Sequence, residues 1–203
     1  MMLCQSRDII GADTWARDGS WVADGGYPLQ RRVWGQRAGV LGMGRIGAAV
    51  ARRLEGFGMD IAYSARSVKD VAYAYIPDPV ALAARSDFLF VTLSASAETR
   101  HIVGPSVIAA LGPQGMLINI SRAGNIDEEA LLVALETGAL GSAALDVFEG
   151  EPALNPRFLA LQNVLLQPHH ASGTVETRQA MGALVRDNLA AHFAGRELLT
   201  PVL

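Results

Sequence analysis

The sequence predicts an α/β protein with a doubly wound parallel sheet. Short apolar runs recur along the chain, and longer segments with helical spacing of apolar residues separate them. Half of the 203 residues are hydrophobic and 18% are charged, which indicates a sizeable core. Most of the runs lack polar/apolar alternation, as is typical of parallel strands buried on both faces. Strands and helices that alternate in this way are expected to join by right-handed crossovers.

The strands are expected to alternate with helices along most of the chain. The apolar runs predict strands at 38–42, 60–64, 88–93, 116–121, 142–148 and 163–168. The first helix, Arg45–Glu55, carries Ile46, Val50 and Leu54 on one face and is followed by Gly56. The other helices are expected at 79–85 and 105–111, which begin with proline, at 127–137, which begins with acids, and at 174–194.

The two ends of the chain depart from this pattern. Residues 1–19 look like part of a helix, and 19–36 is expected to be a loop rich in glycine and aromatic residues. Gly195 is expected to end the last helix before the tail 195–203.

Composition narrows the classes of partner and compartment. The net charge of −3 comes from mixed signs, which argues against a nucleic-acid surface. A single cysteine, Cys4, excludes an internal disulfide and suits a reducing compartment. No apolar run reaches the ~20 residues that would span a membrane. The first residues do not resemble a signal peptide, because Arg7 and Asp8 interrupt their apolar stretch. We therefore expect a cytoplasmic protein with neither membrane nor nucleic-acid partners.

Three glycines after the first strand predict a dinucleotide site. Gly42 would permit a tight turn, Gly44 would let the backbone approach a pyrophosphate, and Gly47 would let the helix pack closely on the strand. The helix N-terminus would offer N–H groups to the phosphates. A glycine-rich turn without a ligand is the alternative, but the motif here follows an apolar strand and opens an amphipathic helix, as the dinucleotide reading requires.

The end of the second strand bears on which dinucleotide is bound. An Asp or Glu there would hold the ribose 2′-hydroxyl of NAD. The segment instead has Ser64, Arg66 and Ser67, which can donate to a 2′-phosphate, and Lys69 would add attraction. The alternative is a solvated basic turn. We expect NADP(H) as the preferred cofactor, with NAD(H) second.

Charged residues that follow three later strands predict a reactive rim, by which we mean the edge of the sheet formed by the carboxyl ends of its strands. Arg122 follows the fourth strand, Asp146, Glu149 and Glu151 follow the fifth, and His169 follows the last. Ligands of an open parallel sheet bind outside the carboxyl ends of its strands. These side chains should therefore converge where a nicotinamide would lie.

Four motifs in this order resemble the D-isomer-specific 2-hydroxyacid dehydrogenase family. They are GMGRIG (42–47), NISRAGNIDEEAL (119–131), ALDVFEGEP (144–152) and PHHASGT (168–174). The Ser-x-Arg-Ser segment and SGTVETR (172–178) resemble the NADPH-preferring glyoxylate, hydroxypyruvate and hydroxyphenylpyruvate reductases of that family. The resemblance implies a Rossmann-type NAD(P)-binding domain in a reductase of small 2-oxoacids to D-2-hydroxyacids.

The resemblance also implies the role of each site residue. Arg122 would hold the substrate carboxylate and polarise its carbonyl, and His169 would protonate the developing alkoxide as general acid. Glu151 would pair with His169, and Asp146 would contact the nicotinamide carboxamide. From the residues alone, Glu149 competes with Glu151 and His170 with His169; the family's pattern favours Glu151 and His169. No metal site is expected.

The cofactor contacts implied by the resemblance run along the whole rim. They are Gly42, Met43, Gly44, Arg45, Ile46, Gly47, Ser64, Arg66, Ser67, Leu93, Thr99, Ile120, Ser121, Arg122, Asp146, His169, Ala171 and Ser172. Two positions depart from the family's pattern. Ala123 stands where glycine is common, which would strain a left-handed backbone, and SASAET (94–99) lacks a common proline.

The family builds two domains, and this chain matches the cofactor domain. Residues 1–19 would be a remnant of the inter-domain helix, 20–194 the dinucleotide-binding domain, and 195–203 a tail that belongs to a substrate domain largely absent here. The resemblance further implies a homodimer through the cofactor domain. We expect cofactor binding with weak or absent turnover.

Two other functions compete with this reductase. A non-catalytic dinucleotide-sensing or protein-interaction module, resembling the family's corepressors, is the alternative from another class. A formate-type dehydrogenase is disfavoured, because that activity goes with Gln rather than Glu beside the histidine.

Overall fold

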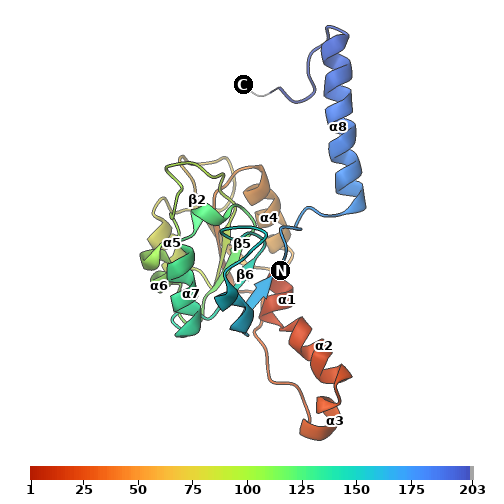
Figure 1. Cartoon of the computed structure of the whole chain (residues 1–203). Helices are drawn as coiled ribbons and strands as arrows, with labels where there is room; N and C mark the ends of the chain where they lie inside the picture. The colour runs from red at the N-terminus through yellow and green to blue at the C-terminus, as the bar shows by residue number, and fades with distance from the viewer. Residues whose placement is uncertain (202–203) are drawn as a thin grey trace. The chain divides into compact units, whose positions relative to one another are not determined.

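The computed structural model describes residues 1–201 and divides into two compact units, Met1–His169 and His170–Leu203 (Figure 1). The first unit holds a seven-stranded parallel sheet in the order β3-β2-β1-β4-β5-β6-β7. The predicted fold class, a doubly wound parallel α/β sheet, is confirmed. The strands are β1 (Arg37–Leu41), β2 (Asp60–Ser64), β3 (Ala74–Tyr75), β4 (Phe88–Val91), β5 (Met116–Asn119), β6 (Ser142–Leu145) and β7 (Val164–Leu166).

The strand order reverses between β1 and β4, which lie side by side although β2 and β3 intervene in the chain. In sheets of this kind, ligands bind at such a switch point, outside the carboxyl ends. The predicted runs 88–93 and 142–148 extend past the observed strands, because Thr92–Leu93 and Asp146–Phe148 leave the sheet into the loops of that edge. The short edge strand β3 was not predicted.

Helices cover both faces of the sheet (Figure 1). The helices α5 (Pro79–Arg85), α6 (Pro105–Leu111) and α7 (Glu128–Glu136) pack into one core cluster, with Phe148 and Phe158. The second cluster contains residues of α1 (Met2–Ser6) and α4 (Arg45–Glu55). The predicted bounds of α4, α5 and α6 are confirmed, since local signals set them: α5 and α6 have proline in the first turn.

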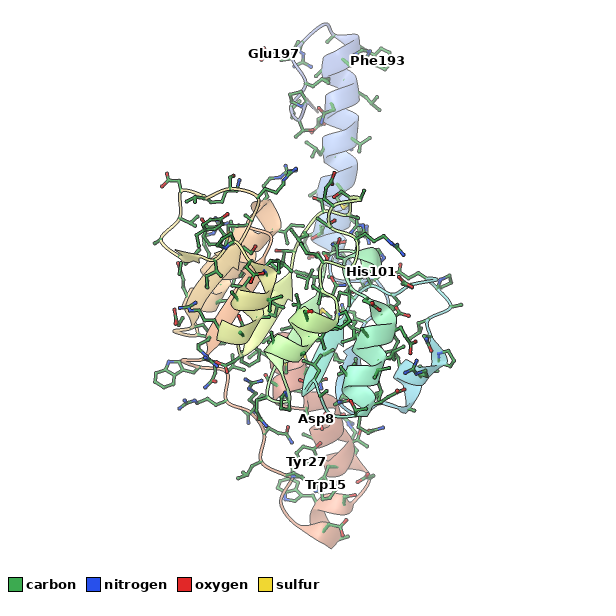
Figure 2. All side chains as sticks on the ribbon, turned by 90° about the vertical axis from the view of Figure 1, so that its left-hand side faces the viewer. Asp8, Trp15, Tyr27, His101, Phe193 and Glu197 are labelled. Atoms are coloured by element: carbon green, nitrogen blue, oxygen red, sulfur yellow. The ribbon has the colours of Figure 1, made fainter. Side chains whose placement is uncertain are left out.

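The N-terminal segment is more broken than the sequence predicts. Asp8 has a left-handed backbone, with φ of 42°, and separates α1 from α2 (Ile9–Arg17). The predicted loop over 19–36 was wrong at its start, where α3 (Ser20–Asp24) forms a short helix. The hydroxyl of Tyr27 donates to the carboxylate of Asp8, and the Tyr27 ring meets Trp15 edge-on at 5.6 Å between centroids. Figure 2 shows these three side chains together.

The second unit contains α8 (Val175–Phe193), which confirms the predicted closing helix. Thr174 caps it by accepting from the Thr177 N–H. Apolar side chains along this helix are solvent-exposed, with Val175 at 68% and Phe193 at 83%. None of the helices within residues 1–201 is both long and apolar enough to cross a membrane.

Candidate active site

The turn between β1 and α4 leaves open space where a pyrophosphate would approach. Gly42 has a left-handed backbone, φ 106°, and a Cβ there would lie 2.9 Å from the Leu93 nitrogen. A Cβ on Gly47 would overlap the carbonyl oxygen of Gly42. At Gly44, by contrast, no described atom lies within 4 Å of an added Cβ. Two glycines are thus required by packing, and the third faces free space.

The first turn of α4 is ready to bind an anion. Gly44 is the N-cap in extended conformation, and among the described residues no side chain caps this turn. Its N–H groups therefore have no intrahelical acceptor, and the helix dipole places partial positive charge there. Arg45 and Ile46 are exposed beside the turn, whereas Met43 is buried in the core beneath it. The residues present fit a dinucleotide phosphate.

Thr92 holds the glycine turn from the neighbouring strand end. Its hydroxyl donates to the Gly42 carbonyl at 2.7 Å. Sequence reasoning missed this residue, although a threonine that directly follows the apolar run of β4 is a signal that could have found it. The next residue, Leu93, lies against Gly42.

The loop 65–70 carries the residues expected at a 2′-phosphate. Arg66 and Ser67 are exposed on it, and the Lys69 ammonium lies 3.2 Å from the Ser67 hydroxyl. Ser64 is only 4% exposed, and its hydroxyl donates to the Pro77 carbonyl at 3.0 Å. Two of the three predicted donors thus face solvent, while Ser64 is engaged within the protein.

Thr99 closes the loop that follows β4. Its hydroxyl accepts from the Ser96 N–H at 2.8 Å and donates to the Ser94 carbonyl at 2.9 Å. The pKa of Glu98 lies below its usual value, chiefly because of a hydrogen bond with the Ser96 side chain, with a smaller contribution from the charge of Arg66.

A buried polar network positions Arg122. Asn119, at the end of β5, accepts through Oδ1 from the Ser121 N–H at 3.0 Å and from the Ser121 hydroxyl at 2.7 Å. The Asn119 amide donates to the Arg122 carbonyl at 3.2 Å. The Arg122 guanidinium donates to the Ser121 carbonyl at 2.7 Å and is otherwise open to solvent. Ile120, between Asn119 and Ser121 in the sequence, is half-buried.

Asn125 connects this network to the loop after β4. The residue is fully buried, and its amide donates to the Leu93 carbonyl at 3.2 Å and to the Ser121 hydroxyl at 3.0 Å. Sequence reasoning missed Asn119 and Asn125; a polar side chain inside an apolar strand run was the available signal for the first. Ala123 begins the 3₁₀ turn Ala123–Asn125, so this position does not require the left-handed backbone that would have strained alanine.

Glu151 and His169 are in hydrogen-bond contact at the carboxyl ends of the strands. Nδ1 of His169 lies 2.7 Å from Oε2 of Glu151, and Oε1 of Glu151 accepts from the Phe148 N–H at 2.9 Å. Burial is the largest single effect and opposes ionisation of Glu151, but the two hydrogen bonds together with the charges of His169 and Arg122 outweigh it. The pKa of Glu151 therefore lies below its usual value. His169 itself has a left-handed backbone, φ 49°.

Glu149, the rival of Glu151, lies elsewhere. Its backbone N–H donates to Glu128 at 2.8 Å, and its carboxylate lies 3.7 Å from Nε2 of His101. Figure 2 labels His101, whose own N–H donates to the Gly124 carbonyl at 2.8 Å. Glu151 is thus the carboxylate that meets His169.

The remaining predicted contacts divide between the two units. Asp146 is buried directly after β6, and its N–H donates to the Asn119 carbonyl at 3.0 Å. His170, Ala171 and Ser172 belong to the second unit, where the Gly173 N–H donates to the His170 carbonyl. Within residues 1–201, no three His, Cys, Asp or Glu side chains gather as metal ligands.

Curated relatives align with nearly all of this chain. The glyoxylate/hydroxypyruvate reductase A of Arabidopsis thaliana is 48% identical over 204 residues, which cover 100% of this chain and 65% of the relative. The 2-ketogluconate reductase of Gluconobacter oxydans is 40% identical, with 100% and 66% covered. The chain thus spans about two thirds of the length of these relatives.

Solved structures share the fold. A 2-hydroxyacid dehydrogenase from Ketogulonicigenium vulgare is 70% identical with a TM-score of 0.96, covering 100% of this chain and 64% of that one. An NADPH-dependent glyoxylate/hydroxypyruvate reductase from Sinorhizobium meliloti, solved with NADP and malonate, is 44% identical with a TM-score of 0.94, covering 99% and 64%.

The family model "D-isomer specific 2-hydroxyacid dehydrogenase, NAD binding domain" matches residues 1–171. That range includes the glycine turn, Arg122, Glu151 and His169. The chain therefore belongs to the D-isomer specific 2-hydroxyacid dehydrogenase family, and residues 1–171 are its NAD-binding domain.

Proposed function

We propose that this chain is the cofactor-binding part of an NADPH-dependent reductase that converts small 2-oxoacids to D-2-hydroxyacids. The observation that carries the proposal is the 2.7 Å contact between Glu151 and His169, near the charge of Arg122 and on the edge of the sheet that carries the glycine turn. An imidazole can donate the proton that the reduced carbonyl needs, a carboxylate can orient that imidazole, and a guanidinium can bind the carboxylate of a 2-oxoacid. The relatives named as reductases support the same class.

The chemistry assigns a task to each residue. A bound NADPH supplies the hydride for the carbonyl carbon. Arg122 binds the carboxylate of the 2-oxoacid and polarises the neighbouring carbonyl. His169 has Nδ1 against Glu151, so Nε2 is the nitrogen that donates a proton to the alkoxide oxygen. Glu151 holds the proton on Nδ1, orients the ring and stabilises the imidazolium.

The preference for NADPH rests on the loop 65–70. Arg66, Ser67 and Lys69 lie together on it, so three donors are available to a 2′-phosphate. A carboxylate that would bind the 2′-hydroxyl of NAD is missing from the end of β2, where Ser64 is turned to Pro77. The NADP complex of the Sinorhizobium meliloti relative supports the same preference.

A cofactor titration tests the proposal. The intrinsic fluorescence of the chain would be followed while NADPH or NADH is added. We expect tighter binding of NADPH, and Arg66→Ala should weaken it by about 1–3 kcal/mol, the range for hydrogen bonds to charged groups. Arg52→Ala, which removes another exposed arginine from α4, is the matched control and should leave both affinities unchanged.

Turnover is tested separately with glyoxylate and hydroxypyruvate. We expect NADPH to bind with weak turnover or none. NADPH bound without turnover of either 2-oxoacid by a version extended with a substrate domain would favour a dinucleotide-sensing module instead. Equal affinities for NADPH and NADH would contradict the NADP preference.

We also propose that the chain forms a homodimer through its cofactor domain. Apolar side chains that stand in solvent on α2 and α3, such as Ile10 at 62% and Trp21 at 65% exposed, support an association of this kind. Sedimentation equilibrium would measure it, and a monomer at every concentration would contradict it.

A further inference from the structure

The loop that carries the 2′-phosphate donors has no secondary structure of its own. Residues 65–70 are neither helix nor strand, and Arg66, Ser67 and Lys69 are all exposed. An irregular loop with long charged side chains would lose much conformational entropy on binding a phosphate. Something in the protein must hold its backbone if the loop is to favour NADPH.

Tyr63 holds the far end of the loop. The ring lies in the core at 0% exposed, one residue before the end of β2. Its phenol oxygen accepts from the Lys69 N–H at 2.7 Å and donates to the Lys69 carbonyl at 3.3 Å. One side chain thus contacts both backbone polar groups of Lys69: it is the acceptor for the N–H, while the carbonyl also accepts from the Val71 N–H at 2.9 Å.

Tyr75 holds the near end. It lies on β3 directly opposite Tyr63 in the parallel register, and the two rings pack 5.3 Å apart between centroids. The Tyr75 hydroxyl donates to the Ala65 carbonyl at 3.0 Å. The two-residue strand β3 therefore brings a second phenol to the same loop.

The chain offers a matched tyrosine whose hydroxyl bonds to a residue outside this loop. Tyr73 lies two residues before Tyr75, and its hydroxyl donates to the Glu55 carboxylate at 2.7 Å. It belongs to the same core cluster as Tyr63 and Tyr75. A substitution at Tyr73 therefore reports the general effect of removing a phenol from this region.

We infer that Tyr63 and Tyr75 are positioning residues for cofactor selectivity: together they hold Ala65 and Lys69 so that Arg66, Ser67 and Lys69 are arranged for a 2′-phosphate before it binds. This inference rests on the proposed NADPH preference. It assigns selectivity to two tyrosines that touch no phosphate, in addition to the exposed donors. The hydroxyls act only on the loop, so their loss should affect the 2′-phosphate and spare the rest of the cofactor.

The experiment compares ligands that differ only in that phosphate. Tyr63→Phe, Tyr75→Phe and Tyr73→Phe would be titrated calorimetrically with adenosine 2′,5′-bisphosphate and with 5′-AMP. We expect the first two variants to bind the bisphosphate about 5- to 10-fold more weakly, the effect of losing about one hydrogen bond. Binding of 5′-AMP should change by less than about 2-fold, and Tyr73→Phe should match the parent for both ligands.

Amide hydrogen exchange gives a readout without any ligand. The Lys69 N–H should be protected in the parent and should exchange faster in Tyr63→Phe, while the melting temperature shows whether that variant stays folded. If Tyr63→Phe unfolds, the ligand titration of Tyr75→Phe tests the inference instead. The Tyr75 ring is only partly buried, so that variant is expected to stay folded.

Three outcomes separate the inference from the proposed function. A parent that favours the bisphosphate, with an unchanged preference in both Tyr63→Phe and Tyr75→Phe, would overturn the inference and leave the NADPH preference intact. Equal loss of both ligands would overturn it as well, since it would show a general structural role. A parent without any preference would overturn the NADPH proposal itself.

Discussion

Gly44 and Gly47 stand three residues apart on the same turn, yet they are glycines for different reasons. At Gly47 a methyl group would overlap the Gly42 carbonyl, whereas at Gly44 it would project into open space. The first position serves the packing of helix against strand, and the second serves the ligand. Substitution by alanine should therefore separate stability from binding.

We predict that Gly47→Ala destabilises the protein by about 1–3 kcal/mol, the usual cost of overpacking. Gly44→Ala should unfold at the parent's denaturant midpoint but bind NADPH at least about 10-fold more weakly, because its methyl group would occupy the space of the pyrophosphate. Urea denaturation and cofactor titration measure the two effects. Gly44→Ala with parental NADPH affinity would show that the diphosphate does not lie on this turn.

At the scale of an element, α7 does more than cover the sheet. Asp127 caps it by accepting from the Ala130 N–H at 3.0 Å, and Glu128 reaches from its first turn to the Glu149 N–H. Glu129 and Glu136 bind Arg157 from the segment before β7. The sequence indicated only that acids begin this helix; the partners of Glu128 and Glu129 lie 21 and 28 residues away and have no local signature.

Glu128 gives a pH-dependent prediction. Burial raises its pKa, the charges of Glu149 and Glu129 raise it further, and the hydrogen bond from Glu149 opposes them. A carboxyl whose pKa is raised on folding stabilises the protein at low pH and loses that contribution as the pH rises through the folded-state value.

We therefore predict that Glu128→Gln is as stable as the parent below about pH 4 and more stable at pH 7, by less than about 1 kcal/mol because the group is partly exposed. The glutamine keeps an oxygen for the Glu149 N–H. Thermal unfolding at both pH values measures the difference, and Glu129→Gln, which loses a partner of Arg157, should not become more stable. A Glu128→Gln variant less stable than the parent at pH 7 would contradict the prediction.

At the scale of the whole molecule, the edge of the sheet opposite the site is held by Asp87. Arg37 donates to its carboxylate through Nε and Nη2, both at 3.0 Å, and through the backbone N–H at 2.9 Å. Arg31 lies 3.5 Å away and also stacks over Phe88. The hydrogen bonds from Arg37 outweigh burial and hold the pKa of Asp87 below its usual value.

A carboxyl whose pKa is lowered on folding contributes stability above its unfolded-state pKa and loses it as the pH falls through the folded-state value. Asp87→Asn should thus be less stable than the parent at pH 7, by about 1–3 kcal/mol, and the difference should shrink below about pH 4. Asp60→Asn is the matched control, because the Asp60–Arg85 pair is more exposed and should matter little. Denaturant unfolding across pH measures both; an equal loss at pH 7 and pH 2 would contradict the charge-based account.

The sequence predicts those features that depend on neighbouring residues and misses those that depend on residues far apart in the chain. The bounds of α4 to α6 follow from prolines, glycines and apolar spacing within each segment, and the alternating strands define the sheet. The direction of the Ser64 hydroxyl toward Pro77 and the buried links of Asn125 depend on residues that meet only after folding. The same holds for β3, whose two residues form a strand only because β2 lies beside them.

Asn125 stands in the middle of an unbroken series of contacts. Gly42 rests on Leu93, the Leu93 carbonyl receives the Asn125 amide, and Asn125 reaches Ser121, which adjoins Arg122. The anchor proposed for the diphosphate and the anchor proposed for the substrate carboxylate are therefore joined by a spacer of fixed length. These contacts set the distance between the bound diphosphate and the bound substrate carboxylate. A shorter or longer side chain in place of Asn125 would therefore shift both binding sites.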